Sequence, residues 1–414
     1  MAGFKLLILQ IGTILIVARL VGWVFGKLHQ PRVVGEMLAG FLLGPSLLGW
    51  LAPNISSALF PTDSLGHLNS LSQLGLLIFM FLVGLELDLG HLRELGRAAV
   101  MTSQVSIVVP FILGSAFAIY LYPRLSNPTV SFTGFALFMG AAMSVTAFPV
   151  LARILTETEM LRTRVGSVAI ACAAVDDVTA WCLLAGITVI VRSSSLDLPV
   201  WLTVSGLGVF VVVMGLVVRP ALRRLEMVYE KRRKLTQDLI AIILLVVLAS
   251  GWITESLGVH ALFGAFLAGV MMPRHGKLST ELSQKFEALI VVLLLPIYFA
   301  LTGLRSSIFL ISDGTMWLYC AVIIALAVAG KLGGSMLSAR LNGMSWRESA
   351  AVGVLMNTRG LVELVILNIG LDLGILSPAL FSIMVLMALV TTLMTTPLLR
   401  WFYRDPEPAS NPKA

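Results

Sequence analysis

The chain has 414 residues, of which 58% are hydrophobic and 12% are charged, and its mean hydropathy is +0.95. This composition excludes an ordinary water-soluble protein and leaves no stretch for a soluble domain. The net charge of +7 does not indicate nucleic acid as a partner, because basic residues of membrane proteins gather in cytoplasmic loops.

Thirteen apolar segments follow one another along the chain, most of them near the roughly 20 residues that a helix needs to cross about 30 Å of hydrocarbon. The first segment is too long for the core of a signal peptide, so we expect it to be a retained span. The sequence predicts an all-α membrane protein with transmembrane helices at residues 4–26, 32–51, 68–87, 98–121, 131–152, 165–191, 199–218, 238–255, 258–272, 286–304, 315–339, 349–371 and 377–399.

The loops predict the orientation of these spans. With the N-terminus outside, nearly all loop lysines and arginines lie on the inner side, and the outer exceptions are Lys5, Arg124, Arg192 and Arg305. The positive-inside rule therefore places the C-terminus in the cytoplasm. We interpret the long basic loop at 219–237 as a topology signal rather than a contact with lipid headgroups. Residues 403–414 are polar and are expected to form a disordered cytoplasmic tail.

Four charged residues, Asp176, Asp177, Lys331 and Arg359, fall well inside apolar segments. A charge at mid-bilayer costs roughly 2.5 to 3.5 kcal/mol, so such residues usually mark an ion or proton path. Adjacent side chains on a helix point about 100° apart. We expect one aspartate to pair with a buried amine and the other to face a cavity, where its oxygens bind a monovalent cation. A plain salt bridge between helices, without a transport role, is the alternative.

Lys331 is the expected partner of one aspartate, because the small residues around it allow another helix to approach closely. A lysine can lose its proton when its ion pair breaks, whereas an arginine holds its charge. The alternative is a lysine that extends from the end of its span to the membrane surface. For Arg359 a structural role is favoured, in which it holds helix ends or the carboxylate of Glu363 one turn later.

Two transmembrane segments are predicted to be broken. Pro149 interrupts the segment at 131–152, and the polar residues from Asn357 to Gly360 interrupt the segment at 349–371. Transporters use such breaks to aim backbone carbonyls and helix dipoles at ions, although an ordinary proline kink is an alternative. The breaks lie seven spans apart and so cross in opposite directions. This indicates two inverted six-helix repeats, at about 1–192 and 238–402, joined by a linker helix at 199–218.

Four stretches of sequence carry a resemblance to a known family. They read TAFPVLARIL at 146–155, AVDDVTAW at 174–181, NTRGLVEL at 357–364 and FLVGLELD at 81–88. They resemble the cation:proton antiporters of the Kef, Nap and plant CHX type, which form the monovalent cation:proton antiporter-2 family, and the similarity extends over nearly the whole chain. The resemblance implies the sodium/proton antiporter fold, with crossed discontinuous helices, and a homodimer in which a mobile core domain moves like an elevator.

The resemblance also implies roles for individual residues. Asp177 matches the ion-binding aspartate, Asp176 the aspartate that pairs with a lysine, and Lys331 that lysine, while Thr146 matches the unwound backbone that helps to bind the ion. Pro149, Asn357, Arg359 and Glu363 are expected to support the crossed helices. Kef-type members carry a soluble nucleotide-binding domain after the membrane part, and this chain shows none, so regulation of that kind is not expected.

These observations predict a transporter in the cell membrane, and not an enzyme, in which Na⁺ or K⁺ competes with protons for Asp177, with Asp176 contributing to the cation site. The exchange is expected to be electrogenic and to need no cofactor. A gated monovalent cation channel and a Kef-like efflux system are the alternatives. An intramembrane aspartyl protease would need Tyr-Asp and Gly-x-Gly-Asp contexts, and neither occurs here.

Overall fold

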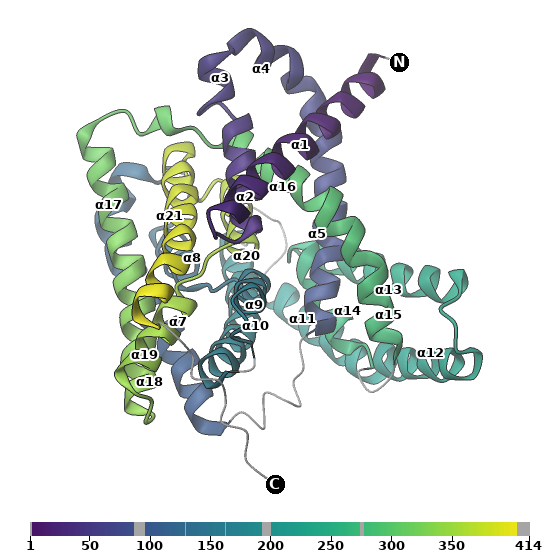
Figure 1. Ribbon diagram of the computed structural model, residues 1–414. Helices are drawn as coiled ribbons and strands as arrows, with labels where there is room; N and C mark the ends of the chain where they lie inside the picture. The colour runs from purple at the N-terminus through teal and green to yellow at the C-terminus, as the bar shows by residue number, and fades with distance from the viewer. Residues whose placement is uncertain are drawn as a thin grey trace. The chain divides into compact units, whose positions relative to one another are not determined.

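The structure, a computed structural model, describes residues 2–86, 96–128, 130–161, 163–192, 200–273 and 277–403. All regular secondary structure in these ranges is helical (Figure 1). The predicted all-α class is therefore confirmed. Leu87 and Asp88, which end the stretch at 81–88, lie outside the described residues, as does the predicted tail apart from Tyr403.

Within the described residues, eleven helical segments are long and apolar enough to cross a membrane, and a bent pair of helices makes up to twelve. A shorter apolar helix, α14 (Ala261–Met271), accompanies them. Each of the thirteen predicted segments overlaps one of these. The multi-pass membrane architecture is thus confirmed, with α14 as the one predicted span that falls short of the length of a full crossing.

The helices divide between two compact units of the chain. The first unit comprises Met1–Leu15, Phe60–Leu89 and Ala185–Leu301. Its helices are η1 (Thr62–Ser64), α5 (Leu65–Glu86), α11 (Val200–Val213), the π-helical turn η2 (Met214–Val218), α12 (Arg219–Arg232), α13 (Gln237–Ser256), α14, α15 (Lys277–Leu289) and the π-helical turn η3 (Ile290–Leu294). Large apolar side chains such as Trp201, Val209 and Trp252 are exposed on α11 and α13. Exposed apolar helix faces are what contact with lipid requires.

The second unit comprises Ile16–Leu59, Gly90–Leu184 and Thr302–Ala414. Its helices are α2 (Arg32–Leu43), α3 (Leu48–Leu51), α4 (Pro53–Leu59), α7 (Gly96–Leu125), α8 (Phe132–Ser144), α9 (Phe148–Glu157), η4 (Ile308–Leu310), α17 (Gly314–Val328), the π-helical turn η5 (Ala329–Gly333), α18 (Gly334–Leu341), α19 (Trp346–Met356), α20 (Leu361–Asp372) and α21 (Pro378–Phe402). Three helices, α1 (Ala2–Lys27), α10 (Arg164–Arg192) and α16 (Leu295–Arg305), contribute residues to both units.

Both predicted breaks are present in the second unit. Helix α8 ends at Ser144, because Val145 and Ala147 adopt extended backbone angles, and α9 begins with Pro149 in its first turn. Helix α19 ends at Met356, and the axis of α20 is bent by 41° from it. Proline is well placed at the start of a helix, where its missing N–H would have no partner in any case. In each pair, the first half-helix thus ends and the second begins only a few residues later.

A π-helical turn, η5, carries Lys331. Helices α7, α8, α18 and η5 pack together in this part of the unit. Gly330 is required by that packing, since a Cβ atom there would lie 2.9 Å from the Cα atom of Pro110 on α7. The close approach buries the side chain of Lys331 completely. A π-helical turn widens a helix locally and is frequent at functional sites.

Candidate functional site

The two breaks touch each other. The backbone N–H of Ala147 donates to the carbonyl of Thr358 over 3.1 Å, so one unwound segment is joined directly to the other. Gly360 makes this approach possible, because a Cβ atom there would lie 2.5 Å from Cγ2 of Val150 and 3.1 Å from Cβ of Ala147. Helix α9 and helix α20 therefore both begin at the crossing.

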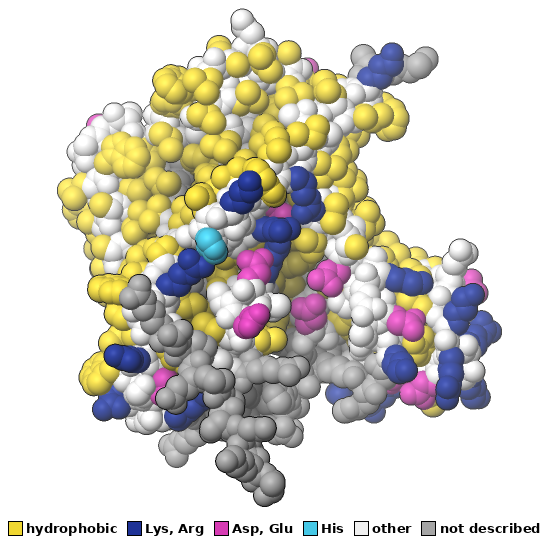
Figure 2. Space-filling view, in the orientation of Figure 1, with side chains coloured by type: hydrophobic (Ala, Val, Ile, Leu, Met, Phe, Trp, Pro, Cys, Tyr) yellow, Lys and Arg dark blue, Asp and Glu magenta, His cyan; other side chains and the backbone are white. Residues whose placement is uncertain are grey.

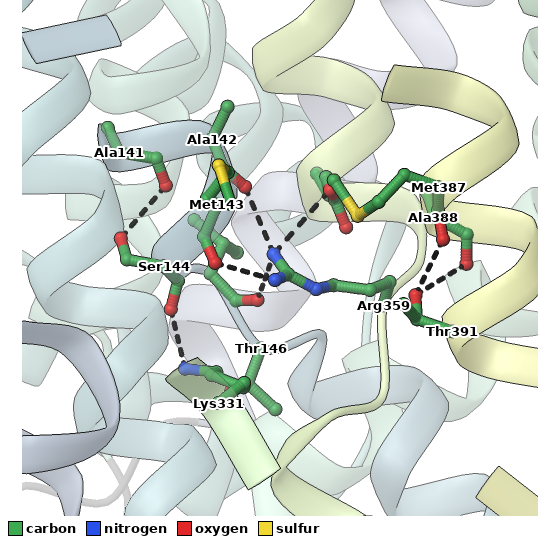
Figure 3. Close-up of polar contacts among 12 residues, drawn as sticks. Ala141, Ala142, Met143, Ser144, Thr146, Lys331, Arg359, Met387, Ala388 and Thr391 are labelled. Carbon is green, nitrogen blue, oxygen red and sulfur yellow. Dashed lines mark hydrogen bonds and ion pairs between the residues drawn. The ribbon is translucent and has the colours of Figure 1, made fainter. Parts of the chain in front are cut away.

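Arg359 caps the end of the first broken helix. Its guanidinium donates to the backbone oxygens of Ala142 and Val145 over 3.0 Å each and to that of Met143 over 2.5 Å (Figure 3). The last carbonyls of a helix lack intrahelical donors and carry the negative end of its dipole. One buried cation thus provides donors for three carbonyls and balances that partial charge. This geometry supports the structural role that the sequence favours for Arg359, which stays a prediction.

The backbone around Arg359 is itself fixed by α21. The N–H of Arg359 donates to Thr392 Oγ1 over 3.1 Å, and the carbonyl of Arg359 lies 3.0 Å from the same hydroxyl. Glu363 Oε1 lies 3.5 Å from the Arg359 guanidinium, with both side chains buried. Neither carboxylate oxygen of Glu363 accepts a hydrogen bond within the described part of the chain. Arg359 and Glu363 therefore balance each other's charge, but no hydrogen bond of good geometry joins them.

Lys331 and Asp176 form a buried ion pair. Lys331 Nζ lies 2.6 Å from Asp176 Oδ2, and neither side chain is exposed. The ammonium group also contacts the backbone oxygens of Ser106 (3.1 Å) and Ser144 (2.5 Å), and the latter contact is drawn in Figure 3. The lysine therefore binds one carbonyl of the α8 terminus, while Arg359 binds three others. Two cations stabilise a single helix end.

Asp176 is saturated with donors. Besides Lys331, it accepts from Ser103 Oγ over 2.7 Å, from Ser106 Oγ over 2.9 Å and from Thr146 Oγ1 over 2.8 Å. Both carboxylate oxygens are occupied, and Thr146, in the first break, reaches the aspartate directly. Hydrogen bonds from charged and hydroxyl donors to a carboxylate are short and strong. In this arrangement Asp176 has little capacity left for a cation.

Asp177 differs sharply from its neighbour. Its side chain is buried, and neither of its oxygens has a hydrogen-bond partner of good geometry among the described residues. The backbone N–H of Phe148, at the start of α9, is the favourable dipole beside it. A buried carboxylate without a hydrogen bond of good geometry is costly, so such a group in a native fold calls for an explanation. Two free hard oxygen donors suit a cation or a proton.

The remaining predicted residue, Asn357, lies at the second break. Its side chain is buried, and Oδ1 has no hydrogen-bond partner among the described residues, nor does the hydroxyl of neighbouring Thr358. Pro149 is half-buried in the first turn of α9. No group of three or more His, Cys, Asp or Glu side chains that could hold a metal ion occurs within the ranges that the structure describes. In the described part of the chain, buried polar atoms without a hydrogen-bond partner therefore occur both at the crossing and at Asp177.

Two residues at the site are not among the sequence predictions. Ser103 and Ser106 on α7 supply two of the donors to Asp176. They lie three residues apart, which places both hydroxyls on one face of a helix. That spacing, inside an apolar segment, is the signal that could have identified them. What it does not provide is the identity of the acceptor, which is about 70 residues away in the chain.

Comparison with known proteins identifies the relatives of this chain. The family model described as "Sodium/hydrogen exchanger, transmembrane" matches residues 14–402. The Na⁺/H⁺ antiporter NhaS4 of Synechocystis sp. is 42% identical over 402 residues, which cover 97% of this chain and 98% of that protein. Cation/H⁺ antiporter 17 of Arabidopsis thaliana is 41% identical, and K⁺/H⁺ antiporter 1 of Saccharomyces cerevisiae is 36% identical, each over 97% of this chain.

The chain spans about half the length of the plant and yeast relatives, 49% and 46% respectively. Among solved structures, the sodium proton antiporter MjNhaP1 from Methanocaldococcus jannaschii superposes with a TM-score of 0.66 over 96% of both chains, at 13% identity. The structural similarity establishes the fold. All of these relatives are transporters and not enzymes.

Proposed function

The chain belongs to the sodium/hydrogen exchanger family, and we propose that it exchanges a monovalent cation, Na⁺ or K⁺, for protons across a membrane. Its relatives include antiporters named for sodium, for potassium and for cations in general. The identity of the cation is left between Na⁺ and K⁺, because selectivity depends on the size of the site and the number of its ligands. No cofactor is required.

The single observation that carries this proposal is the contrast between two adjacent aspartates. Asp176 accepts from four donors, whereas Asp177 is buried with both oxygens uncommitted. We assign Asp177 as the group for which the cation and the proton compete. Asp176 and Thr146 complete the site when Lys331 releases its carboxylate. Competition couples the two fluxes, because a site that holds the cation must first lose its proton.

Alternating access is proposed to proceed by an elevator movement within a homodimer. The division of the chain into two compact units supports this, because such a movement needs parts that can shift as rigid bodies. The paired breaks of α8–α9 and α19–α20 support inverted repeats at about 1–192 and 238–402, with the linker at 199–218. The distribution of loop charges supports an outer N-terminus and a cytoplasmic C-terminus.

The exchange is proposed to be electrogenic. If Asp176, Asp177 and Lys331 all change their charge or partner during the cycle, two protons can move for each monovalent cation. Voltage then contributes about 2.3 kcal/mol per net charge per 100 mV. Currents on solid-supported membranes at several pH values test this, and an exchange that carries no current would contradict it.

Two alternative functions would use the same site residues. A gated cation channel would need no competing proton acceptor, and the buried uncommitted carboxylate of Asp177 favours the exchanger over it. A Kef-like efflux system would exchange K⁺ under ligand control. A cation flux that does not change with an imposed pH gradient would support the channel. A flux that depends on an added cytosolic ligand would support the efflux system.

Reconstitution in proteoliposomes tests the proposed function. Asp177→Asn keeps the size of the side chain and removes the charge, so we expect it to abolish cation-dependent pH change. Asp63→Asn, at an exposed position in η1, serves as the matched control and should leave exchange intact. In the unmodified protein, the apparent KM for the cation should rise by up to about tenfold for each unit of decrease in pH. Full exchange by Asp177→Asn would refute the assignment.

A further inference from the structure

A second polar site lies in the same unit and shares no residue with the ion site. It is a pocket of about 610 Å³ formed by the turn between α1 and α2, the end of α9 and the last turns of α21. Its basic lining residues are Lys27, His29, Arg32, Arg153 and Arg400, against one acidic residue, Glu157. We propose that this pocket binds the phosphate headgroup of an anionic phospholipid.

The charge of the pocket is only partly balanced by the protein. Arg153 Nε lies 3.2 Å from Glu157 Oε1, so these two side chains neutralise each other. Arg32 and Arg400 form no hydrogen bond and no salt bridge within 4 Å with any described residue, and both are exposed at the pocket. The buried carboxylate of Glu36 offsets part of the charge of Arg32 at longer range. Guanidinium groups match the geometry of phosphate oxygens and bind them with two parallel hydrogen bonds. Two arginines without a directly bonded carboxylate in one pocket therefore favour a phosphate anion.

Buried polar atoms in the pocket point to the same ligand. Thr396 is only 3% exposed, and its hydroxyl has no hydrogen-bond partner among the described residues. The side-chain oxygen of Gln30 is likewise buried without a partner, although its amide nitrogen donates to Leu393. A buried polar group without a hydrogen-bond partner destabilises the fold. A phosphate oxygen would accept from Thr396, and a headgroup hydroxyl, as in glycerol, would donate to Gln30.

The surroundings of the pocket indicate a lipid rather than a soluble anion. Figure 2 shows Lys and Arg side chains gathered near a histidine, with hydrophobic side chains bordering them. Exposed apolar residues adjoin the pocket on α1 (Leu20 and Val24), in the turn that follows α1 (Leu28) and on α21 (Trp401). Trp23 lines the pocket itself and lies under the ammonium of Lys27, 3.7 Å from the ring centroid. Tryptophan marks the depth of the headgroups, and basic pockets between membrane helices bind anionic headgroups.

The test measures lipid binding by the whole purified protein in detergent. Native mass spectrometry gives the Kd for phosphatidylglycerol and for phosphatidylcholine, and thermal unfolding gives the Tm with each lipid and with inorganic phosphate. The variant Arg32→Gln/Arg400→Gln removes both free guanidinium groups. The matched control, Arg223→Gln/Arg224→Gln, removes two exposed arginines from α12. Thr396→Val removes the buried hydroxyl without changing the charge.

We expect phosphatidylglycerol to bind more tightly than phosphatidylcholine and to raise the Tm. At about fivefold per arginine, the double pocket variant should bind it roughly 25-fold more weakly. Thr396→Val should weaken binding severalfold, and the α12 control should bind as the unmodified protein does. Equal binding of both lipids, or unchanged binding by the pocket variant, would overturn the proposal. An equal rise in Tm with inorganic phosphate, lost in the pocket variant, would assign the site to a soluble anion and so overturn the lipid assignment.

Discussion

The guanidinium of Arg359 donates a hydrogen bond of 3.0 Å to the backbone oxygen of Val145, 214 positions earlier in the chain. In a continuous helix that oxygen would accept from the N–H of residue 149, which is a proline and has none. The cation from the second break therefore supplies the donor that the first break lacks. Each interrupted helix depends on the other, so neither break is expected to be stable alone.

Arg359→Gln should destabilise the protein strongly. The substitution removes the donors to Ala142, Met143 and Val145 and leaves Glu363 buried without its counter-charge. Removing one partner of a buried ion pair typically costs about 3 to 5 kcal/mol. Thermal unfolding of the purified protein measures the loss as a lower Tm. Arg164→Gln, which removes an arginine whose side chain is 63% exposed, is the control and should change the Tm little.

The double variant Arg359→Gln/Glu363→Gln distinguishes two causes of this destabilisation. One is the loss of the hydrogen bonds to the α8 carbonyls, and the other is the loss of the counter-charge of Glu363. If the loss comes from the unpaired carbonyls at the end of α8, the double variant stays as unstable as the single one. If the loss of stability comes from the unpaired carboxylate of Glu363, the double variant should regain the stability of the unmodified protein. We expect most of the loss to persist, because Arg359 makes three hydrogen bonds to backbone oxygens and none to Glu363 within the described residues. An unchanged Tm in the single variant would contradict the capping role itself.

The sequence predicts most of this fold because hydrophobic length is a direct physical requirement of the bilayer. It also predicts the breaks, since Pro149 and the polar residues from Asn357 to Gly360 cannot continue a lipid-exposed helix. It predicts that Arg359 holds helix ends or Glu363, but it does not identify α8 as the helix whose end Arg359 binds. That contact depends on two distant segments meeting, and sequence spacing carries no information about such a meeting.

The pair formed by Asp176 and Lys331 should behave as a unit. Asp176→Asn leaves a buried ammonium without its counter-charge, and Lys331→Gln leaves a buried carboxylate, so each should cost about 3 to 5 kcal/mol. Asp176→Asn/Lys331→Gln removes both charges and should cost clearly less than the sum of the single losses. Thermal unfolding of the four proteins gives the coupling energy. Additive losses would mean that the ion pair contributes nothing beyond its separate hydrogen bonds.

Ser106 is predicted to matter more than Ser103. The hydroxyl of Ser106 lies 2.9 Å from Asp176 Oδ2 and 3.0 Å from Lys331 Nζ, so it joins both members of the ion pair, whereas Ser103 contacts Asp176 alone. A hydrogen bond to a charged group contributes about 1.5 to 3 kcal/mol. Ser106→Ala should therefore lower the Tm more than Ser103→Ala does.

Ser103→Ala and Ser106→Ala also test whether the two serines position Asp176 for exchange or only pack against it. If the serines orient Asp176 for exchange, their loss should change the pH profile of cation-dependent pH change in proteoliposomes, and the effect should again be larger for Ser106→Ala. Ser115→Ala, on the same helix but bonded to the carbonyl of Ala136, is the control and should leave the pH profile in place. Equal profiles for all three variants would restrict the serines to a packing role.

Gly360→Ala tests whether the contact between the breaks is needed. The new methyl group would lie 2.5 Å from Cγ2 of Val150 and 3.1 Å from Cβ of Ala147, so the two unwound segments must separate. The hydrogen bond from Ala147 N–H to the Thr358 carbonyl should then lengthen, with loss of exchange and about 1 to 3 kcal/mol of stability, as in overpacked cores. Val150→Ala removes the nearer obstacle, so Val150→Ala/Gly360→Ala should recover part of both. Val150→Ala alone serves as the control for the cavity it leaves. A fully active Gly360→Ala protein would show that the segments tolerate separation and that their close crossing is not required for exchange.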